Sequence, residues 1–372
     1  MKPIVFGAPE PTPDLEQAVI GVLRSGWWGA GSVSEEVERR LEQLTGAKYA
    51  VLVSSGTAAL HSILAAAGIS PGDEVVTTPM TYAATAHAIE LCGARPVFAE
   101  IDPLTGALDP RAAESKIGPR TTAILPVHLY GRPCNMEAFR EIADRKKILF
   151  VEDAAHALGA SIRGIQAGTV GIAGALSFNY QKNVAAAEGG AVLTNESKIA
   201  VRARQFAHQG ESKTTYERYK DHVSSQVVML GANYRPTDIG AAMIKVGLSR
   251  FTQIQGGRLR AWDAYQEHLA DLPVVRPLPI GPKIMHGVHL YQIRVPVPRE
   301  ELREALQSQG IGTGVHYRAL HLEPYYRERY GHREGEFPLA EEFGKTTLSL
   351  PLSSSMTEED VVRVAGALRR LI

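Results

Sequence analysis

Residues 49–101 read YAVLVSSGTAALHSILAAAGISPGDEVVTTPMTYAATAHAIELCGARPVFAEI and contain the pattern that decides the fold. Short apolar runs alternate here with Ala-rich segments of helical character. The alternation continues downstream, so that apolar runs lie at 49–53, 74–78, 95–101, 121–127 and 147–153. Apolar strands separated by helices are typical of βαβ units, which form a mostly parallel sheet buried on both faces. The sequence therefore predicts an α/β fold.

The remaining segments predict an addition to this sheet and a second, smaller unit. Two closely spaced apolar runs, 174–178 and 190–195, leave no room for a parallel crossover and indicate an antiparallel pair, so the sheet is expected to be mixed. A helical pattern over 237–272 ends at the Pro-rich segment PVVRPLPIGP. We expect a large domain over 1–245 and a smaller α+β domain over 246–372.

The smaller domain is expected to combine strands and helices. Its predicted elements are a strand in HLYQIRVPV, a helix in PREELREALQSQG, the segment GTGVHY at 312–317 and the terminal helix TEEDVVRVAGALRRLI. Together these elements indicate a smaller unit with a core of its own. No internal repeat or low-complexity tract is visible in the sequence.

The composition is that of an ordinary globular protein and excludes several functional classes. Hydrophobic residues make up 44% of the 372 residues, and 40 basic residues balance 40 acidic ones. With a formal net charge of +0, no overall field attracts the chain to nucleic acid or anionic membranes. Cys92 and Cys134 are the two cysteines, and without a CxxC motif or a Cys/His cluster they argue against disulfides and metal sites.

The sequence carries no pattern for export or membrane insertion. The N-terminal apolar run is just Ile4, Val5 and Phe6, far shorter than a signal-peptide core. The uncharged stretch 49–72 is interrupted by polar residues and Pro71, which favours a strand, a turn and a helix over a membrane span. We expect a cytoplasmic protein.

Ser54-Ser55-Gly56-Thr57 stands where the first predicted strand ends and a helix begins. Backbone N–H groups at such a helix N-terminus can bind a phosphate. Serine and threonine also cap helices routinely, and the motif lacks the lysine of a P-loop and the GxGxxG spacing. The motif alone leaves both interpretations open.

Asp153 follows Glu152 at the carboxyl end of the apolar run ILFV, where ligands of open α/β sheets usually bind. Acids after an apolar strand also occur in nucleotide hydrolases, but no GxxxxGK[ST] motif is present. The remaining alternatives are a carboxylate for the pyridinium nitrogen of a cofactor and a solvated or capping acid.

Lys182 lies in an unusually uncharged stretch. Within twelve positions on either side there is no other Lys or Arg, and Glu188 is the one acid. Lysine is ordinarily a solvated surface residue, but desolvation lowers its pKa and frees its amine to form a Schiff base. Together with Asp153 and a phosphate cup, such a lysine meets three requirements of pyridoxal phosphate: an anchor, a partner for the ring nitrogen and an internal aldimine.

Seven ordered segments make the chain similar to fold-type I aminotransferases of the DegT/StrS type, which aminate keto-sugars. These segments are GWWGAGSVSEEVERRLEQLTGAKYAVLVSSGTAAL, VVTTPMTYAATAHAI, VEDAAHALGA, SFNYQKNVAAAEGGAVLTN, GANYRPTDIGAAM, GTGVHYRALH and LSLPLSSSMTEEDV. The resemblance runs nearly end to end. It implies pyridoxal 5'-phosphate as cofactor, with the catalytic roles of Lys182 and Asp153 as above.

The resemblance also implies roles for further residues around the cofactor. Gly56, Thr57 and Ser177 would bind the phosphate, and Tyr82 would stack on the ring. His156 would lie near the ring, and Asn233 would reach the phosphate held by the partner subunit. These roles predict a homodimer with shared active sites.

Three residues of the small domain, His316, Tyr317 and His321, are candidates for substrate contacts, although each can equally be a packing residue. Departures from relatives occur at Met80, Thr81 and the alanines 185–187, and these positions bear on ring contacts and substrate preference.

The predicted reaction moves an amino group from L-glutamate or L-glutamine to a keto-sugar, expected to be nucleotide-linked. A cyclitol aminotransferase is an alternative that the sequence does not separate. Lys182 argues against a related sugar dehydratase, in which another residue replaces the lysine. A non-catalytic cofactor-binding regulator is less favoured, because no DNA-binding segment accompanies the domain.

Overall fold

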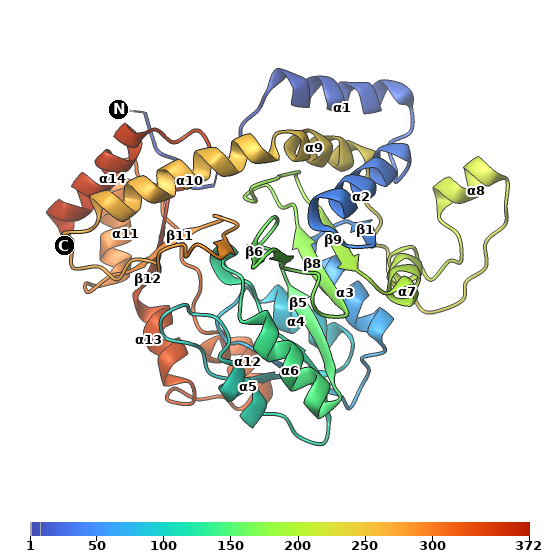
Figure 1. The fold of residues 1–372 in the computed structure, drawn as a ribbon, viewed down its shortest axis with the longest axis horizontal. Coiled ribbons are helices and arrows are strands. Elements are labelled where there is room, and N and C mark those ends of the chain that lie inside the picture. Colours follow the sequence, from blue (N-terminus) through green and yellow to red (C-terminus); the bar gives the residue numbers. More distant parts are fainter. Residues whose placement is uncertain (1, 8) are drawn as a thin grey trace.

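The computed structural model describes residues 2–7 and 9–372, and at its centre lies a seven-stranded sheet (Figure 1). Each apolar run predicted to be a strand of the sheet forms one, which confirms the α/β prediction. In spatial order the strands are β1 (Tyr49–Val53), β9 (Gly190–Thr194), β8 (Ala173–Ser177), β5 (Leu149–Asp153), β4 (Thr121–Leu125), β2 (Glu74–Thr77) and β3 (Arg95–Phe98).

The directions of these strands place four functional segments at one edge of the sheet. β9 is antiparallel to both of its neighbours, β1 and β8, while every other adjacent pair is parallel. β1 therefore runs in the same direction as β8, β5, β4 and β2. The turns that follow these strands meet at the same edge, where ligands of open α/β sheets bind.

Helices cover both faces of the sheet, because side chains along each strand alternate between two hydrophobic cores. In β1, Ala50 and Leu52 belong to one core, while Val51 and Val53 belong to the other. The first core includes residues of α2 (Ser32–Thr45), α6 (Met136–Lys146) and α9 (Asp238–Ser249). The second includes residues of α3 (Gly56–Ala67), α4 (Ala84–Leu91) and α7 (Ser197–Ala207).

A third core lies in the C-terminal part of the chain. It contains residues of α10 (Phe251–His268), α11 (Arg299–Ser308), α14 (Glu358–Leu371), and the antiparallel strands β11 (Tyr291–Arg294) and β12 (Thr347–Leu350). Ile4, from the other end of the chain, packs in this core and bridges to Ile311. A domain boundary near residue 245 remains our prediction, with Ile4 crossing it.

One local prediction for the C-terminal part needs correction. The helical pattern over 237–272 forms two helices, since α9 ends at Ser249 and α10 begins at Phe251, with Arg250 between them. The segment 312–317 is irregular; Gly314 forms a β-bridge with Ser349 of β12, and His316 adds contacts with Ser349 and Thr347.

The remaining elements surround these layers. They are α1 (Pro13–Ser25), α5 (Pro110–Ser115), η1 (Leu129–Gly131), β6 (Ser161–Ile162), β7 (Ile165–Gln166), α8 (Thr215–Asp221), β10 (Ile284–Met285), η2 (Leu320–Leu322), α12 (Pro324–Tyr330) and α13 (Pro338–Thr346). Figure 1 shows α8 at the end of an arm that projects from the body of the molecule. Among the described residues, no helix is long and apolar enough to span a membrane.

Candidate active site

A cavity of about 560 Å³ opens where the carboxyl ends of the parallel strands meet the C-terminal core. Its walls come from the turns after β1, β2, β5 and β8, and from the segments around His289 and His316. Phe6 and Gly7 of the N-terminal segment also line it. The topology thus brings together side chains that lie more than two hundred residues apart in the sequence.

The turn after β1 contains both a helix cap and an open helix N-terminus. The hydroxyl of Ser55 accepts a hydrogen bond from the backbone N–H of Ala58 at 3.1 Å, so Ser55 caps α3. Gly56 and Thr57 begin the helix and face the cavity. A Cβ added to Gly56 would lie 2.9 Å from the Cβ of Ser177, so glycine allows the β8 turn to approach the helix. The positive end of the α3 dipole and the Ser177 hydroxyl form a site suited to a phosphate.

Asp153 ends β5 and holds a buried carboxylate at the cavity wall. Its Oδ2 accepts a hydrogen bond from the hydroxyl of Thr85 at 2.8 Å, and its Oδ1 accepts one from the backbone N–H of Ala155 at 3.1 Å. The Thr85 hydroxyl in turn lies 2.7 Å from that of Thr81. Burial raises the pKa of Asp153, and these two hydrogen bonds oppose that rise. The carboxylate is thereby fixed in orientation.

Glu152, the neighbouring acid, faces away from Asp153 because successive strand residues point to opposite faces of the sheet. It is fully buried and accepts hydrogen bonds from the backbone N–H groups of Gly168, Val170 and Gly171 at 2.7–2.8 Å. Its Oε1 also lies 3.1 Å from Nε2 of His128. Glu152 therefore stabilises the 168–171 loop and does not line the cavity.

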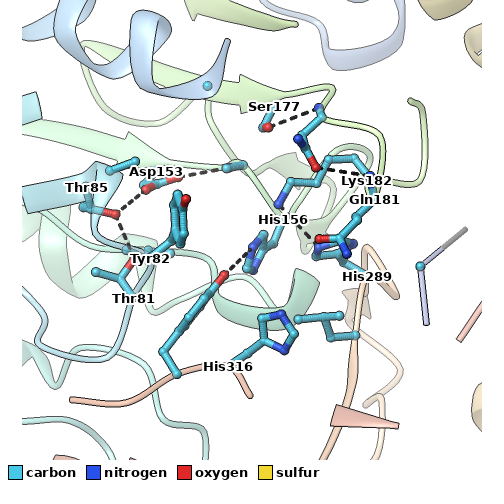
Figure 2. Close-up of a pocket in the computed structure, with 18 of the residues that line it drawn as sticks. Thr81, Tyr82, Thr85, Asp153, His156, Ser177, Gln181, Lys182, His289 and His316 are labelled. Atoms are coloured by element: carbon cyan, nitrogen blue, oxygen red, sulfur yellow. Dashed lines mark hydrogen bonds between the residues drawn. The ribbon is translucent and has the colours of Figure 1, made fainter. Parts of the chain in front are cut away.

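Lys182 extends into the cavity from the turn after β8, and Figure 2 shows its side chain directed toward His156 and His289. Burial lowers the pKa of its amine to about 8, against the opposing charges of Asp153 and Glu188. An amine with this pKa is partly uncharged near neutral pH and can act as a nucleophile or a base.

His156 is held as a neutral side chain between two partners. Its Nδ1 accepts a hydrogen bond from the backbone N–H of Tyr130 at 3.3 Å, so the proton is on Nε2, which lies 3.1 Å from the hydroxyl of Tyr317. Burial, followed by the charge of Lys182, lowers the pKa of His156 well below its ordinary value.

Residues 10–369 match the model of the DegT/DnrJ/EryC1/StrS aminotransferase family. The chain belongs to this family. SpsC of Bacillus subtilis (strain 168), a spore coat polysaccharide biosynthesis protein, is 37% identical over 365 residues, which cover 96% of this chain and 94% of that protein.

Several solved structures share the whole fold. DesV of S. venezuelae, in complex with a ketimine intermediate, is 36% identical and has a TM-score of 0.89, with 96% of this chain and 94% of that chain covered. DesI, in the presence of its TDP-sugar product, is 33% identical with a TM-score of 0.88, and the match covers 100% and 93%. The PLP form of Spr1654 from Streptococcus pneumoniae is 27% identical with a TM-score of 0.92, and both chains are covered completely.

In this aminotransferase, most residues expected at the site from sequence do line the cavity. They are Gly56, Thr57, Tyr82, Asp153, His156, Ser177, Lys182, His316 and Tyr317. Tyr82 is 65% exposed, and its ring centroid lies 6.2 Å from that of Tyr317. The Nδ1 of His316 lies 2.9 Å from the hydroxyl of Ser349, and its ring stacks on Phe6.

Two expected site residues lie outside the cavity of this chain. His321 was expected to contact substrate, but it is fully buried in the C-terminal part, where its Nε2 pairs with Glu341 at 3.0 Å. We correct that prediction: His321 packs beside Phe337. Asn233 is exposed, and its Oδ1 accepts a hydrogen bond from Arg235. Its predicted role across a subunit interface remains a prediction.

The sequence analysis did not single out Thr85, Arg258, His289 or Phe6, all of which line the cavity. Thr85 lies one helical turn after Thr81, within hydrogen-bonding range of Asp153, a spacing that could have indicated it. No pattern pointed to Arg258, His289 or Phe6, because tertiary packing alone brings them to the site.

Proposed function

We propose that this protein is a pyridoxal phosphate-dependent sugar aminotransferase that moves an amino group from L-glutamate or L-glutamine to a nucleotide-linked keto-sugar. The observation that carries the proposal is the meeting of Lys182, Asp153 and the N-terminus of α3 in one cavity. An amine, a carboxylate and an anion site are the three groups that this cofactor requires of its protein.

The residues present fit the cofactor. The missing Cβ of Gly56 leaves room beside Ser177 for a phosphate against the first turn of α3. The Asp153 carboxylate, oriented by Thr85 and Ala155, would partner the ring nitrogen. Tyr82, exposed at the cavity, would cover a face of the ring. When bound, pyridoxal phosphate supplies an electron sink that allows a C–H bond beside the substrate nitrogen to ionise.

Lys182 has two tasks in this proposal, and its lowered pKa suits both. Its amine would hold the cofactor covalently, and once displaced by the incoming amino group it would move the proton between the substrate carbon and the cofactor. With a pKa of about 8, roughly a tenth of the amines are uncharged at pH 7 and about half at pH 8. Neutral His156 and Tyr317 bring no further positive charge to the amine.

The relatives support a nucleotide-linked sugar as the acceptor. DesI is described with a TDP-sugar product, and SpsC belongs to polysaccharide biosynthesis. The cavity combines aromatic rings with hydroxyl and imidazole groups, a lining that suits a sugar.

We further infer a homodimer in which Asn233 reaches the cofactor phosphate of the other subunit. On the segment that follows α8, Leu230 is 89% exposed and Val227 is 73% exposed. Exposed apolar side chains gathered on one arm indicate a protein partner, and a second copy of this chain fits the shared site.

The test is a two-stage assay. The protein is first treated with glutamate or glutamine, and loss of the pyridoxal phosphate absorbance identifies the amino donor. The pyridoxamine form is then offered a panel of nucleotide-linked keto-sugars, free keto-sugars and keto-cyclitols, and return of the absorbance identifies the acceptor. We expect a nucleotide-linked keto-sugar to respond, with Lys182→Ala as the inactive control.

The possible outcomes separate the alternatives. Response to a keto-cyclitol alone would keep the aminotransferase chemistry but replace the substrate class. The proposed function would be refuted if neither amino donor reduced the pyridoxal phosphate absorbance and no acceptor restored it.

A further inference from the structure

His289 is a buried side chain that precedes β11 and lies against the reactive end of Lys182. Its Nε2 is 3.4 Å from the Lys182 Nζ, and the residue is 5% exposed. Within residues 2–7 and 9–372, no other side chain or backbone group forms a hydrogen bond with this Nζ.

Asn183 determines which ring nitrogen of His289 carries the proton. Its Nδ2 donates to the backbone carbonyl of Gly287 at 2.5 Å and to Oε1 of Gln255 at 3.0 Å. A carbonyl can only accept, so the amide nitrogen must point there and the Asn183 Oδ1 must face the His289 Nδ1, 3.3 Å away. The amide oxygen also only accepts, so Nδ1 is protonated and Nε2 presents its lone pair to Lys182.

The ring and backbone of His289 are held from two further sides. Arg258, itself buried, donates from its guanidinium to the backbone carbonyls of Val288 and His289 at 2.7 and 2.5 Å. The ring centroid of His156 lies 4.5 Å from that of His289. Burial, followed by the charges of Lys182 and its neighbours, lowers the pKa of His289 well below its ordinary value, so the ring stays neutral.

We propose that His289 is a positioning residue for Lys182: whenever the amine is not bonded to the cofactor, it donates a hydrogen bond to Nε2 and is held at the cavity wall. This inference rests on one part of the proposed function, namely that Lys182 is the reacting amine. A lysine side chain has a flexible four-carbon stem, and without an acceptor the Nζ would sample several rotamers. A protonated histidine could not serve, because it would have no lone pair for the amine.

The test measures the ionisation of Lys182 in the full-length apoprotein. Amines are labelled with acetic anhydride over a range of pH, and mass spectrometry of the peptide that contains Lys182 gives its pKa. The variants are His289→Leu, which removes the acceptor, and His289→Gln, which can place an amide oxygen near the position of Nε2. His268→Leu, near the end of α10, is the matched control, and thermal melts show whether each variant is folded.

A hydrogen bond to Nε2 favours the charged amine, so its loss should lower the Lys182 pKa by about one pH unit in His289→Leu. His289→Gln should restore most of the wild-type pKa, and His268→Leu should leave it unchanged. In ¹⁵N spectra of the wild-type apoprotein, the His289 Nε2 should be unprotonated, and Lys182→Ala should move its resonance more than that of Nδ1.

Three results would overturn the inference: an unchanged Lys182 pKa in His289→Leu, an equally lowered pKa in His289→Gln, or a proton on Nε2. None of these measurements uses a substrate or a catalytic turnover. The inference can therefore fail while the sugar aminotransferase proposal holds, and the reverse is equally possible.

Discussion

Replacing Asp153 by Asn should separate the stability of this protein from its chemistry. The carboxylate makes two hydrogen bonds, to Thr85 and to the backbone N–H of Ala155. A carboxamide can keep both, because its oxygen can accept from Ala155 while its nitrogen donates to the Thr85 hydroxyl. The substitution therefore changes the charge with little change in shape.

The stability of the apoprotein should rise in Asp153→Asn. Burial raises the pKa of Asp153 above its ordinary value of 3.8, so ionising this group opposes folding. For an acid whose pKa is raised in the folded state, ionisation lowers the folding stability at pH values above that pKa. This loss of stability disappears as the pH falls through the raised pKa. The apoprotein of Asp153→Asn should thus melt higher than the wild type at pH 8, and the difference should shrink toward pH 4.

Activity should change in the opposite direction. In the proposed site the carboxylate makes a charge-assisted hydrogen bond to the ring nitrogen, and such bonds contribute about 1.5–3 kcal/mol. Loss of this contribution from the transition state corresponds to a fall in kcat of about 10- to 150-fold.

Steady-state kinetics with saturating donor and acceptor measure this fall, with Asp144→Asn on the exposed side of α6 as the control. A kcat within a few-fold of the wild type, or an apoprotein that melts lower at pH 8, would refute the reasoning.

Three further predictions concern the cofactor. Lys182→Ala should lose transamination and the absorbance of the covalently held cofactor while still binding pyridoxamine phosphate, and spectra of this variant that match those of the wild type would contradict the role of Lys182. In the wild type, the rate of pyridoxal phosphate uptake should rise as the pH passes through about 8, the pKa of the Lys182 amine. Gly56→Ala places a Cβ 2.9 Å from the Cβ of Ser177, an overlap of the kind that costs about 1–3 kcal/mol, so equilibrium dialysis should show cofactor binding weakened about 5- to 150-fold. Sedimentation should show a homodimer, and Asn233→Ala should release cofactor faster on dilution; a fully active monomer would show that one chain builds the whole site.

Local patterns in the sequence were sufficient to predict the strands of the central sheet. They also predicted that the ligand site lies at the carboxyl ends of these strands. Strands buried on both faces require apolar runs, and short runs such as YAVLV and ILFV have few alternative structures. The turn after β1, the acid that ends β5 and the uncharged surroundings of Lys182 follow from residues close together in the chain. These features carry the cofactor prediction.

Tertiary structure decided the features that depend on distant segments. The resemblance pointed to Asp153 in the pair Glu152 and Asp153, but the structure was needed to show that Asp153 lines the cavity while Glu152 binds the 168–171 loop. His316 and His321 looked equivalent in sequence, yet one lines the cavity and the other pairs with Glu341. His289 meets Lys182 across 107 positions of sequence, and its tautomer follows from hydrogen bonds made by Asn183. Such contacts arise when separate elements pack together, and no local pattern encodes them.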